Sequence, residues 1–225
     1  MKKKLLIFGA GETATIAAEF FIVDTKESLA GFVIDDQFWK PGMKHLELPI
    51  YPFSKVKDLF PTSEYKIFVA ISYSKLNRDR QKVFNAFSDL KYEFVSYIST
   101  KATVWRTAEI GKNCMIFEGN NIQHNAKISD NVILWAGNHI GHGSSVDHST
   151  YISSHVCVAG FASIGKRCFL GINSSIIDYI NVADDCFIGA AALINKNTDI
   201  NSIYTGNPAE KNMKITASKF FKVKE

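Results

Sequence analysis

The stretch ISDNVILWAGNHIGHGSSVDHSTYISSHVCV, residues 128–158, decides the fold, because an aliphatic residue returns in it at every sixth position. The same spacing holds without exception over sixteen steps, at Val104, Ile110, Ile116, Ile122, Ile128, Leu134, Ile140, Val146, Ile152, Val158, Ile164, Leu170, Ile176, Val182, Ile188 and Ile194. Helices repeat about every 3.6 residues and strands about every two, so a period of six marks a repeat architecture. The sequence therefore predicts a parallel β-helix.

A second column of side chains, two residues before each aliphatic position, supports this register. Thirteen of its sixteen members are Ala, Ser, Thr, Cys or Val, which fits a narrow interior where large and small inward side chains alternate. With three six-residue strands per coil, residues eighteen apart stack in neighbouring coils, about 4.8 Å from one another. Asn120 and Asn138 break the small column one coil apart. We expect them to form an asparagine ladder inside the coil or to reach the rim of an active site.

Two aromatic residues, Phe117 and Trp135, also stack by this spacing, at a corner where small residues otherwise prevail. An isolated coil would expose both rings to water, so we expect them to pack at a subunit interface. Stacking on a sugar or on CoA is the alternative.

Composition sets modest bounds. The 225 residues suffice for two small domains, and no signal peptide or long apolar run is apparent, so we expect a soluble cytoplasmic protein without membrane insertion. A net charge of +4 without a basic stripe argues against nucleic-acid binding. Cys114, Cys168 and Cys186 fall in the small column and are expected to be buried thiols, and the absence of a C-x-x-C pair gives no reason to expect a metal.

The first 98 residues are built differently, and we expect an α/β domain over 1–98 followed by the coil and its tail over 99–225. Three apolar runs, 3–8, 30–34 and 66–71, alternate with segments of helical period, the second of them at 76–90. Strand, glycine turn, helix and strand form a βαβ unit, whose ligands bind beyond the carboxyl ends of the strands. The domain is too short for the two halves of a complete dinucleotide-binding fold, so half a Rossmann fold is expected.

The turn after the first strand, Gly9-Ala10-Gly11-Glu12-Thr13-Ala14, matches the dinucleotide fingerprint, in which glycines let amides at a helix N-terminus approach a phosphate. We interpret Gly9 and Gly11 as holding the diphosphate of a mononucleotide and the pair Asp35-Asp36 as contributing to the same site. A tight turn without a ligand, with the two acids in solvent, is the alternative.

Over nearly its whole length the chain resembles the sialic-acid O-acetyltransferase-like family, which includes N-acetyltransferases of the bacillosamine and perosamine pathways. The resemblance rests on the short Gly-x-Gly domain with Asp35-Asp36, the unbroken hexapeptide coil and the segment Gly206-Asn207-Pro208-Ala209. It implies a left-handed β-helix, a homotrimer, an N-terminal domain that binds a nucleotide-linked sugar, and acetyl-CoA bound along the coil between subunits.

The family's catalytic histidine follows an aliphatic position by two residues, and His142 matches that place. The eighteen-residue spacing stacks His124 one coil before it, where it is expected to contact the substrate, and Gly160 and Asp178 one and two coils after it. A neutral imidazole is suited to take a proton from an amine as it attacks a thioester. His45, His148 and His155 are interpreted as surface or subunit-contact residues.

The sequence departs from the family at Gly143, where several members carry an acid that orients the catalytic histidine. Either another group orients His142, with Asn138, Asn125 and Asp147 as candidates by their proximity in sequence, or the base works unassisted. The sequence does not distinguish an oriented from an unassisted His142.

For acetyl-CoA, the resemblance points to the later coils. Gly160 would leave room for the thioester and the pantetheine arm, and Ala190, Ala191, Gly206 and Pro208 are expected near the adenine end. The lysines of the tail are candidates for CoA phosphates, although a solvated tail is the better interpretation for most of them: Lys211, Lys214, Lys219, Lys222 and Lys224.

The function expected from all this is transfer of an acetyl group from acetyl-CoA to the amino group of a nucleotide-linked deoxysugar, in polysaccharide or glycan biosynthesis. Acetylation of a sugar hydroxyl is the runner-up. Two rivals are a zinc-dependent protein like the hexapeptide carbonic anhydrases, disfavoured because Asp147 occupies the place of their second histidine ligand, and a nucleotide-sugar-binding protein without catalysis.

Overall fold

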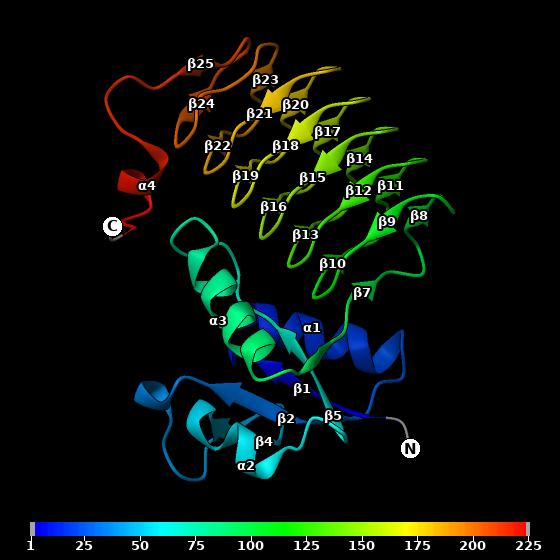
Figure 1. The fold of residues 1–225 in the computed structure, drawn as a ribbon, viewed down its shortest axis with the longest axis vertical. Coiled ribbons are helices and arrows are strands. Elements are labelled where there is room, and N and C mark those ends of the chain that lie inside the picture. Colours follow the sequence, from blue (N-terminus) through cyan, green and yellow to red (C-terminus); the bar gives the residue numbers. More distant parts are fainter. Residues whose placement is uncertain (1–2, 224–225) are drawn as a thin grey trace.

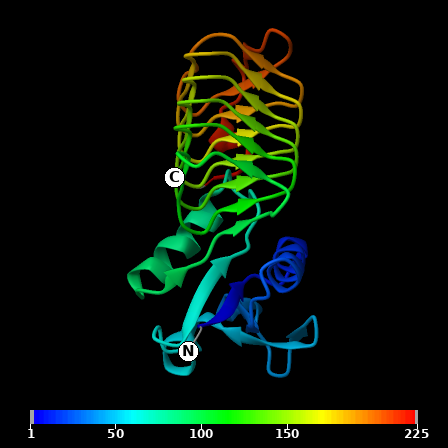
Figure 2. The same cartoon turned by 90° about the vertical axis from the view of Figure 1, so that its right-hand side faces the viewer.

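A computed structural model describes residues 3–223, which form an α/β layer with a β-helix standing on it (Figures 1 and 2). The sheet of the layer has the order β3-β4-β2-β1-β5-β6, and all its neighbours are parallel except the β3–β4 hairpin. Its strands are β1 (Lys4–Phe8), β2 (Leu29–Ile34), β3 (Lys44–His45), β4 (Leu48–Pro52), β5 (Tyr65–Val69) and β6 (Glu93–Phe94). Its helices are α1 (Glu12–Val23), α2 (Val56–Leu59) and α3 (Arg78–Asp89), with short 3₁₀ turns η1 (Asp36–Phe38) and η2 (Phe53–Lys55).

Helices cover both faces of this sheet, because successive side chains of a strand point to opposite sides. Leu5 and Ile7 of β1 lie in a core cluster with α1, whereas Leu6 and Phe8 lie in a second cluster with α2 and α3. The layer is thus the expected half of a Rossmann fold, with the carboxyl ends of β1, β2 and β5 at one edge.

The coil consists of three parallel sheets, one for each face of a triangular prism. The first face holds β7 (Tyr97–Ile98), β10 (Met115–Ile116), β13 (Ile133–Leu134), β16 (Tyr151–Ile152), β19 (Phe169–Leu170), β22 (Phe187–Ile188), β24 (Ile203–Thr205) and the antiparallel β25 (Glu210–Lys211). The second holds β8 (Thr103–Val104), β11 (Asn121–Ile122), β14 (His139–Ile140), β17 (Cys157–Val158), β20 (Ser175–Ile176) and β23 (Leu193–Ile194). The third holds β9 (Glu109–Ile110), β12 (Lys127–Ile128), β15 (Ser145–Val146), β18 (Ser163–Ile164) and β21 (Asn181–Val182).

The register confirms the spacing of eighteen: His139 pairs with Cys157, and Ile140 pairs with Val158. The aliphatic and small columns together form one buried cluster along the axis of the coil. The coil edge between the second and third faces, termed the His142 edge below, includes residues 123–126, 141–144, 159–162 and 177–180. It lies opposite the first face.

The α/β layer packs on the first face, and this overturns the expectation for Phe117 and Trp135. Phe117 is only 4% exposed, and its ring packs edge-on against Phe20 of α1 at 5.4 Å and stacks on Trp135 at 4.5 Å. The pair therefore needs no second subunit to cover it. The prediction that these two rings pack at a subunit interface was wrong.

The expected ladder of Asn120 and Asn138 was also wrong. Both amides donate to backbone carbonyls instead, including that of Trp135, at 2.8 and 2.5 Å. An asparagine ladder does exist at the edge between the third and first faces, where Asn113 donates to Asn131 at 2.8 Å and Asn131 donates to Ser149 at 2.9 Å.

Arg80 of α3 joins the α/β layer to the coil. Its guanidinium is fully buried, and it donates to carbonyls of both parts, those of Ile71, Ser72, Asn131, Ser149 and Thr150. Burial lowers the pKa of Arg80 to about 9, so the side chain remains charged at neutral pH. Charge-assisted hydrogen bonds to both parts tie the two together.

The tail after the coil runs back toward α3 and ends in α4 (Ala217–Phe220), beside the first face (Figure 1). Ala217 is buried, and the Phe221 ring lies 5.4 Å from that of Phe187. The tail is thus anchored by apolar side chains. Of the tail lysines named above, Lys224 lies outside the described residues.

Candidate active site

His142 lies just beyond β14, on the His142 edge of the coil, with its side chain half-buried. Its ring stacks on that of His124 at 5.5 Å, with the planes 11° apart, and meets the ring of Phe161 edge-on at 4.9 Å. Its backbone N–H donates to Oε1 of Gln123 at 3.1 Å. The column predicted from the eighteen-residue spacing thus brings the two histidines together, and neighbours on both sides restrict the imidazole of His142.

Gly160 has no side chain, and the imidazole tip of His142 lies close to the place where one would be. A Cβ atom built on Gly160 would lie 2.7 Å from Cε1 and 2.9 Å from Nε2 of His142, and 3.3 Å from Oδ1 of Asp178. The tip of the imidazole and the carboxylate of Asp178 therefore approach the same small space, termed the Gly160 gap below. Asp178 was placed in this column by the sequence, but no role could be assigned to it without the side-chain directions.

The three candidate groups for orienting His142, Asn138, Asp147 and Asn125, form hydrogen bonds with other partners. Asn138 points into the coil, where it donates to Trp135 and accepts from Val156 N at 2.7 Å. Asp147 accepts from the N–H of His148 at 2.7 Å, on the opposite edge of the third face. Asn125 lies on the His142 edge, where its backbone N–H donates to the hydroxyl of Thr107 at 3.0 Å. None of these bonds orients the His142 ring.

An exposed aromatic pair, Phe161 and Tyr179, adjoins His142 and was missed by the sequence reasoning. The rings stack at 5.1 Å and are 50% and 74% exposed. Both residues have a left-handed backbone, with φ of 57° and 61°, a conformation that bulky side chains rarely adopt. The same left-handed turn recurs at the corresponding corner position of other coils, for example at Asn131 and Arg167, so it belongs to the regular geometry of the coil. The spacing of eighteen between the two residues could have revealed the pair.

The two glycines of the Gly-x-Gly turn have different surroundings: Gly9 is closely packed, whereas Gly11 borders free space. A Cβ on Gly9, with φ of 119°, would lie 2.8 Å from the carbonyl oxygen of Ala70, so Gly9 is required for the packing of β1 against the end of β5. A Cβ on Gly11 would meet nothing within 4 Å. Gly11 precedes α1, whose first N–H groups and helix dipole favour an anion there.

The two acids after β2 also differ. Asp35 lines a cavity of about 290 Å³ together with Lys75 and Lys82. Asp36 instead accepts hydrogen bonds from the N–H and hydroxyl of Ser54, and these bonds lower the pKa of its carboxyl group. Asp35 is therefore the one available to a ligand.

His45, interpreted from the sequence as a surface residue, lies beside the glycine turn. Its Nε2 is 3.0 Å from the hydroxyl of Thr15, which in turn donates to the carbonyl of Gly11 at 3.3 Å. The β3–β4 hairpin brings His45 there, and no sequence pattern predicts its contact with Thr15.

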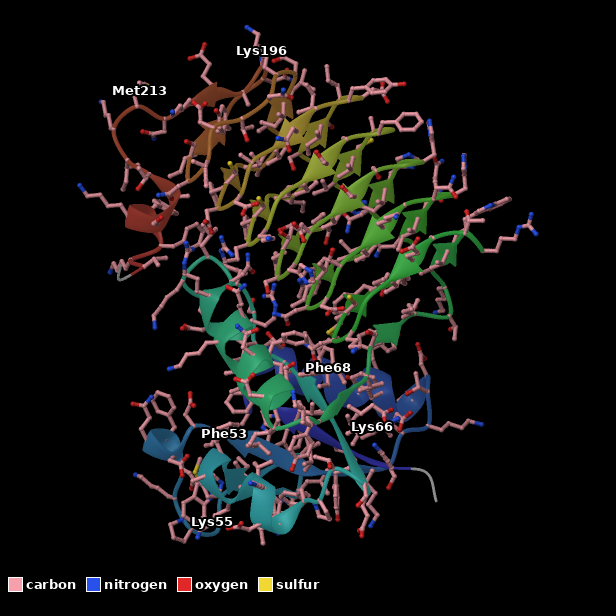
Figure 3. All side chains as sticks on the ribbon, in the orientation of Figure 1. Phe53, Lys55, Lys66, Phe68, Lys196 and Met213 are labelled. Atoms are coloured by element: carbon pink, nitrogen blue, oxygen red, sulfur yellow. The ribbon has the colours of Figure 1, made fainter. Side chains whose placement is uncertain are left out.

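The residues expected near CoA fall into two groups. The Gly206 carbonyl accepts from Leu193 of β23 at 3.1 Å, and Pro208 lines a cavity of about 360 Å³ with Asn195, Lys196 and other residues. Lys196 belongs to the His142 column, three coils later, at the end of the coil farthest from the α/β layer (Figure 3). Ala190 and Ala191 lie at the edge between the first and second faces, away from this column. Of the tail lysines, Lys211 lines the cavity and pairs with Asp199 at 2.7 Å.

The glycine turn and His142 of one chain do not face each other. The glycine turn and Asp35 belong to the layer that packs on the first face, whereas His142 lies on the opposite edge of the coil. In Figure 1, α3 and α4 flank the left side of the coil, and β14, β17 and β20 lie on the right.

Within residues 3–223 there is no cluster of three or more His, Cys, Asp or Glu side chains that could hold a metal ion. The same residues include no helix with the length and apolar character needed to span a membrane.

No protein-family model matches the sequence, and a search of curated proteins finds no relative. Solved structures do match. A perosamine N-acetyltransferase from Caulobacter crescentus, in complex with CoA and GDP-perosamine, has a TM-score of 0.84 at 23% identity, over 94% of this chain and 98% of that one. The acetyltransferase domain of PglB from Neisseria gonorrhoeae, in complex with acetyl coenzyme A, has a TM-score of 0.81 at 21% identity, over 94% and 100%.

The chain has the fold of these acetyltransferases. The match covers both the α/β layer and the coil, and it confirms the predicted left-handed parallel β-helix. WeeI from Acinetobacter baumannii matches over the same 94% of this chain and 100% of its own, with a TM-score of 0.58 at 14% identity.

Proposed function

We propose that this protein transfers an acetyl group from acetyl-CoA to the amino group of a nucleotide-linked amino-deoxysugar. The observation that carries the proposal is the imidazole tip of His142 beside the Gly160 gap, on a coil whose structural neighbours include enzymes in complex with CoA and GDP-perosamine. Two of the neighbouring structures are of variants of the Caulobacter enzyme with one histidine replaced, by asparagine or by alanine.

In the proposed reaction His142 is the general base. The amine nitrogen forms a bond to the thioester carbonyl carbon while the amine gives up a proton to Nε2 of His142. The C–S bond breaks, and the CoA sulfur leaves and takes that proton. A base placed in this way contributes roughly 10²–10⁴-fold to the rate.

The nucleotide of the acceptor is assigned to the α/β layer. A Cβ on Gly11 would meet no atom beyond its chain neighbours within 4 Å, so the residue in front of α1 leaves room for a diphosphate near the amides of the first helical turn. Asp35 beside its cavity suits the ribose hydroxyls, whereas Asp36 holds η2 through Ser54.

Acetyl-CoA is assigned to the His142 edge. From beside the imidazole tip of His142 its pantetheine arm would run over the surface of the column toward Lys196, about 14 Å beyond His142 at the usual spacing of strands. The cavity with Lys196 and Pro208 at that end has the size and charge for the nucleotide end of CoA.

A second copy of the chain would complete the site. Because His142 lies opposite the face that carries the nucleotide half-site, we propose that sugar held by one subunit reaches His142 of its neighbour in a homotrimer. At a sugar-nucleotide concentration well below the raised KM of Gly11→Val, each of the variants His142→Ala and Gly11→Val should be nearly inactive alone, and mixing their subunits should restore activity, because some sites would combine two intact halves. No recovered activity after confirmed subunit exchange would argue against a shared site.

The proposed function is tested by release of free thiol from acetyl-CoA with a panel of nucleotide-linked sugars that carry amino or hydroxyl groups. Thiol release that requires an amino sugar supports the proposal, and release with a hydroxyl sugar alone would favour O-acetylation. Binding of sugar nucleotides without any thiol release would indicate a binding protein. Since its substrates are CoA thioesters and sugar nucleotides, the proposed reaction belongs to the cytoplasm.

A further inference from the structure

Gly143 stands where several members of the family that this chain resembles carry an acid beside the catalytic histidine. Asp178 is a carboxylate that lies close enough to His142 to act in place of that acid. We infer that Asp178 is a positioning residue for His142: its negative charge stabilises the imidazolium that forms when His142 takes the proton of the amine. This inference rests on the proposed function for its kinetic part, and it assigns a role to a residue two coils away from the base.

The geometry brings the two side chains together although their backbones are far apart. Two coil spacings separate the residues by about 10 Å along the axis. Yet Nε2 of His142 and Oδ1 of Asp178 lie within 2.9 and 3.3 Å of one point, the position of a Cβ on Gly160, and hence at most about 6 Å from each other. Both side chains thus lean toward the coil that separates them.

Gly160 makes this approach possible. The residue between the two in the column has no side chain, so neither a methyl group nor a larger group separates the ring from the carboxylate. His124 stacks on the other side of the His142 ring. The surroundings of the ring face and of the ring tip therefore differ, and the Asp178 carboxylate is the nearest group to the Gly160 gap after the His142 ring itself.

A neighbouring group already responds to this charge. Burial and, after it, the negative charge of Asp178 raise the pKa of the Cys157 thiol. Cys157 pairs with His139 on the second face, one coil beyond the strand that precedes His142. The field of Asp178 thus extends to the coil next to the base.

The kinetic test uses Asp178→Asn, which removes the charge and keeps the shape. A unit charge about 6 Å away, at an effective dielectric constant between about 40 and 80, corresponds to a loss of about three- to tenfold in kcat. The KM values for acetyl-CoA and for the amino sugar should change little, and Asp178→Glu should recover most of the rate. In a His142→Ala background, Asp178→Asn should cause no further loss. Glu109→Gln, which removes an exposed charge from the third face, is the control.

Three outcomes would overturn the inference while leaving the proposed function intact. They are an unchanged kcat in Asp178→Asn, an equal loss in the presence and absence of His142, and a rise in the amino-sugar KM alone, which would make Asp178 a substrate-binding residue.

A spectroscopic test does not depend on activity. In protein with ¹⁵N-labelled histidine, the ring resonances of His142 should shift in Asp178→Asn, and those of His148 should not. If no substrate is found, so that the proposed function fails, unchanged His142 resonances would still overturn the proximity that the inference requires, and a selective shift would support it.

Discussion

Replacing Gly160 by alanine should displace the imidazole of His142 without unfolding the coil. The new methyl carbon would lie 2.7 Å from Cε1 and 2.9 Å from Nε2, whereas carbon contacts are optimal at about 3.5–4.0 Å. The tip of the ring must therefore move by about 1 Å. Since the next nearest atom is a carboxylate oxygen at 3.3 Å, and the backbone is not in the left-handed region, the other contacts of the new methyl group are milder than that with the ring.

A displacement of about 1 Å in a catalytic group can cost on the order of 10²-fold in rate. We therefore expect the kcat of thiol release to fall about 10- to 100-fold in Gly160→Ala, with the melting temperature nearly unchanged. Gly189→Ala is the matched control, because its Cβ would meet Thr205 Cγ2 at 2.9 Å, on another edge of the coil. The reasoning is refuted if Gly160→Ala keeps the wild-type kcat, or if it lowers the residual rate of His142→Ala by the same factor.

Three further predictions concern the α/β layer and the core. Gly11→Val, whose side chain would project into open space, should raise the KM for the sugar nucleotide at least tenfold and leave that for acetyl-CoA unchanged; equal weakening of both in steady-state kinetics would mean that the turn is structural. Arg80→Met should lower the free energy of unfolding in urea by about 2–6 kcal/mol, because at least two buried carbonyls lose a charged donor and each unsatisfied group costs about 1–3 kcal/mol, and a loss below about 1 kcal/mol would contradict this role. Burial raises the pKa of the Cys114 thiol from 9.0 to about 12, so its contribution to stability is complete below pH 9 and is lost as the pH rises toward 12. Cys114→Ala should therefore show a shallower fall in unfolding free energy over that range than the wild type, and parallel curves would count against it.

Most of the coil could be predicted from the sequence, because its periodicity directly specifies which side chains point inward. The stacking of His124 on His142 and the position of Gly160 followed from the same spacing. What failed were predictions about contact partners, both of the corner residues Phe117 and Trp135 and of the inward residues Asn120 and Asn138. The spacing placed Phe117 and Trp135 at a corner, but it could not reveal that α1 of the same chain covers them, since that contact depends on how the layer docks on the first face.

The finer parts of the site depend on side-chain directions that no spacing encodes. Asp178 lies thirty-six residues after His142 in the sequence, and its approach to the ring became apparent only through the Gly160 gap. Asp35 and Asp36 are adjacent and chemically alike, yet only the hydrogen bonds to Ser54 distinguish the structural acid from the available one. Arg80 was missed because nothing in a helical segment rich in charges marks one arginine as buried.

The most direct test of the central claim is the mass and structure of the product formed from acetyl-CoA and a nucleotide-linked amino sugar such as GDP-perosamine. We predict that mass spectrometry finds one added acetyl group and that NMR locates it on the sugar nitrogen. His142→Ala should form this product at least about 10²-fold more slowly while remaining folded. An acetyl group on a hydroxyl, or a His142→Ala protein that forms the amide at the wild-type rate, would contradict it.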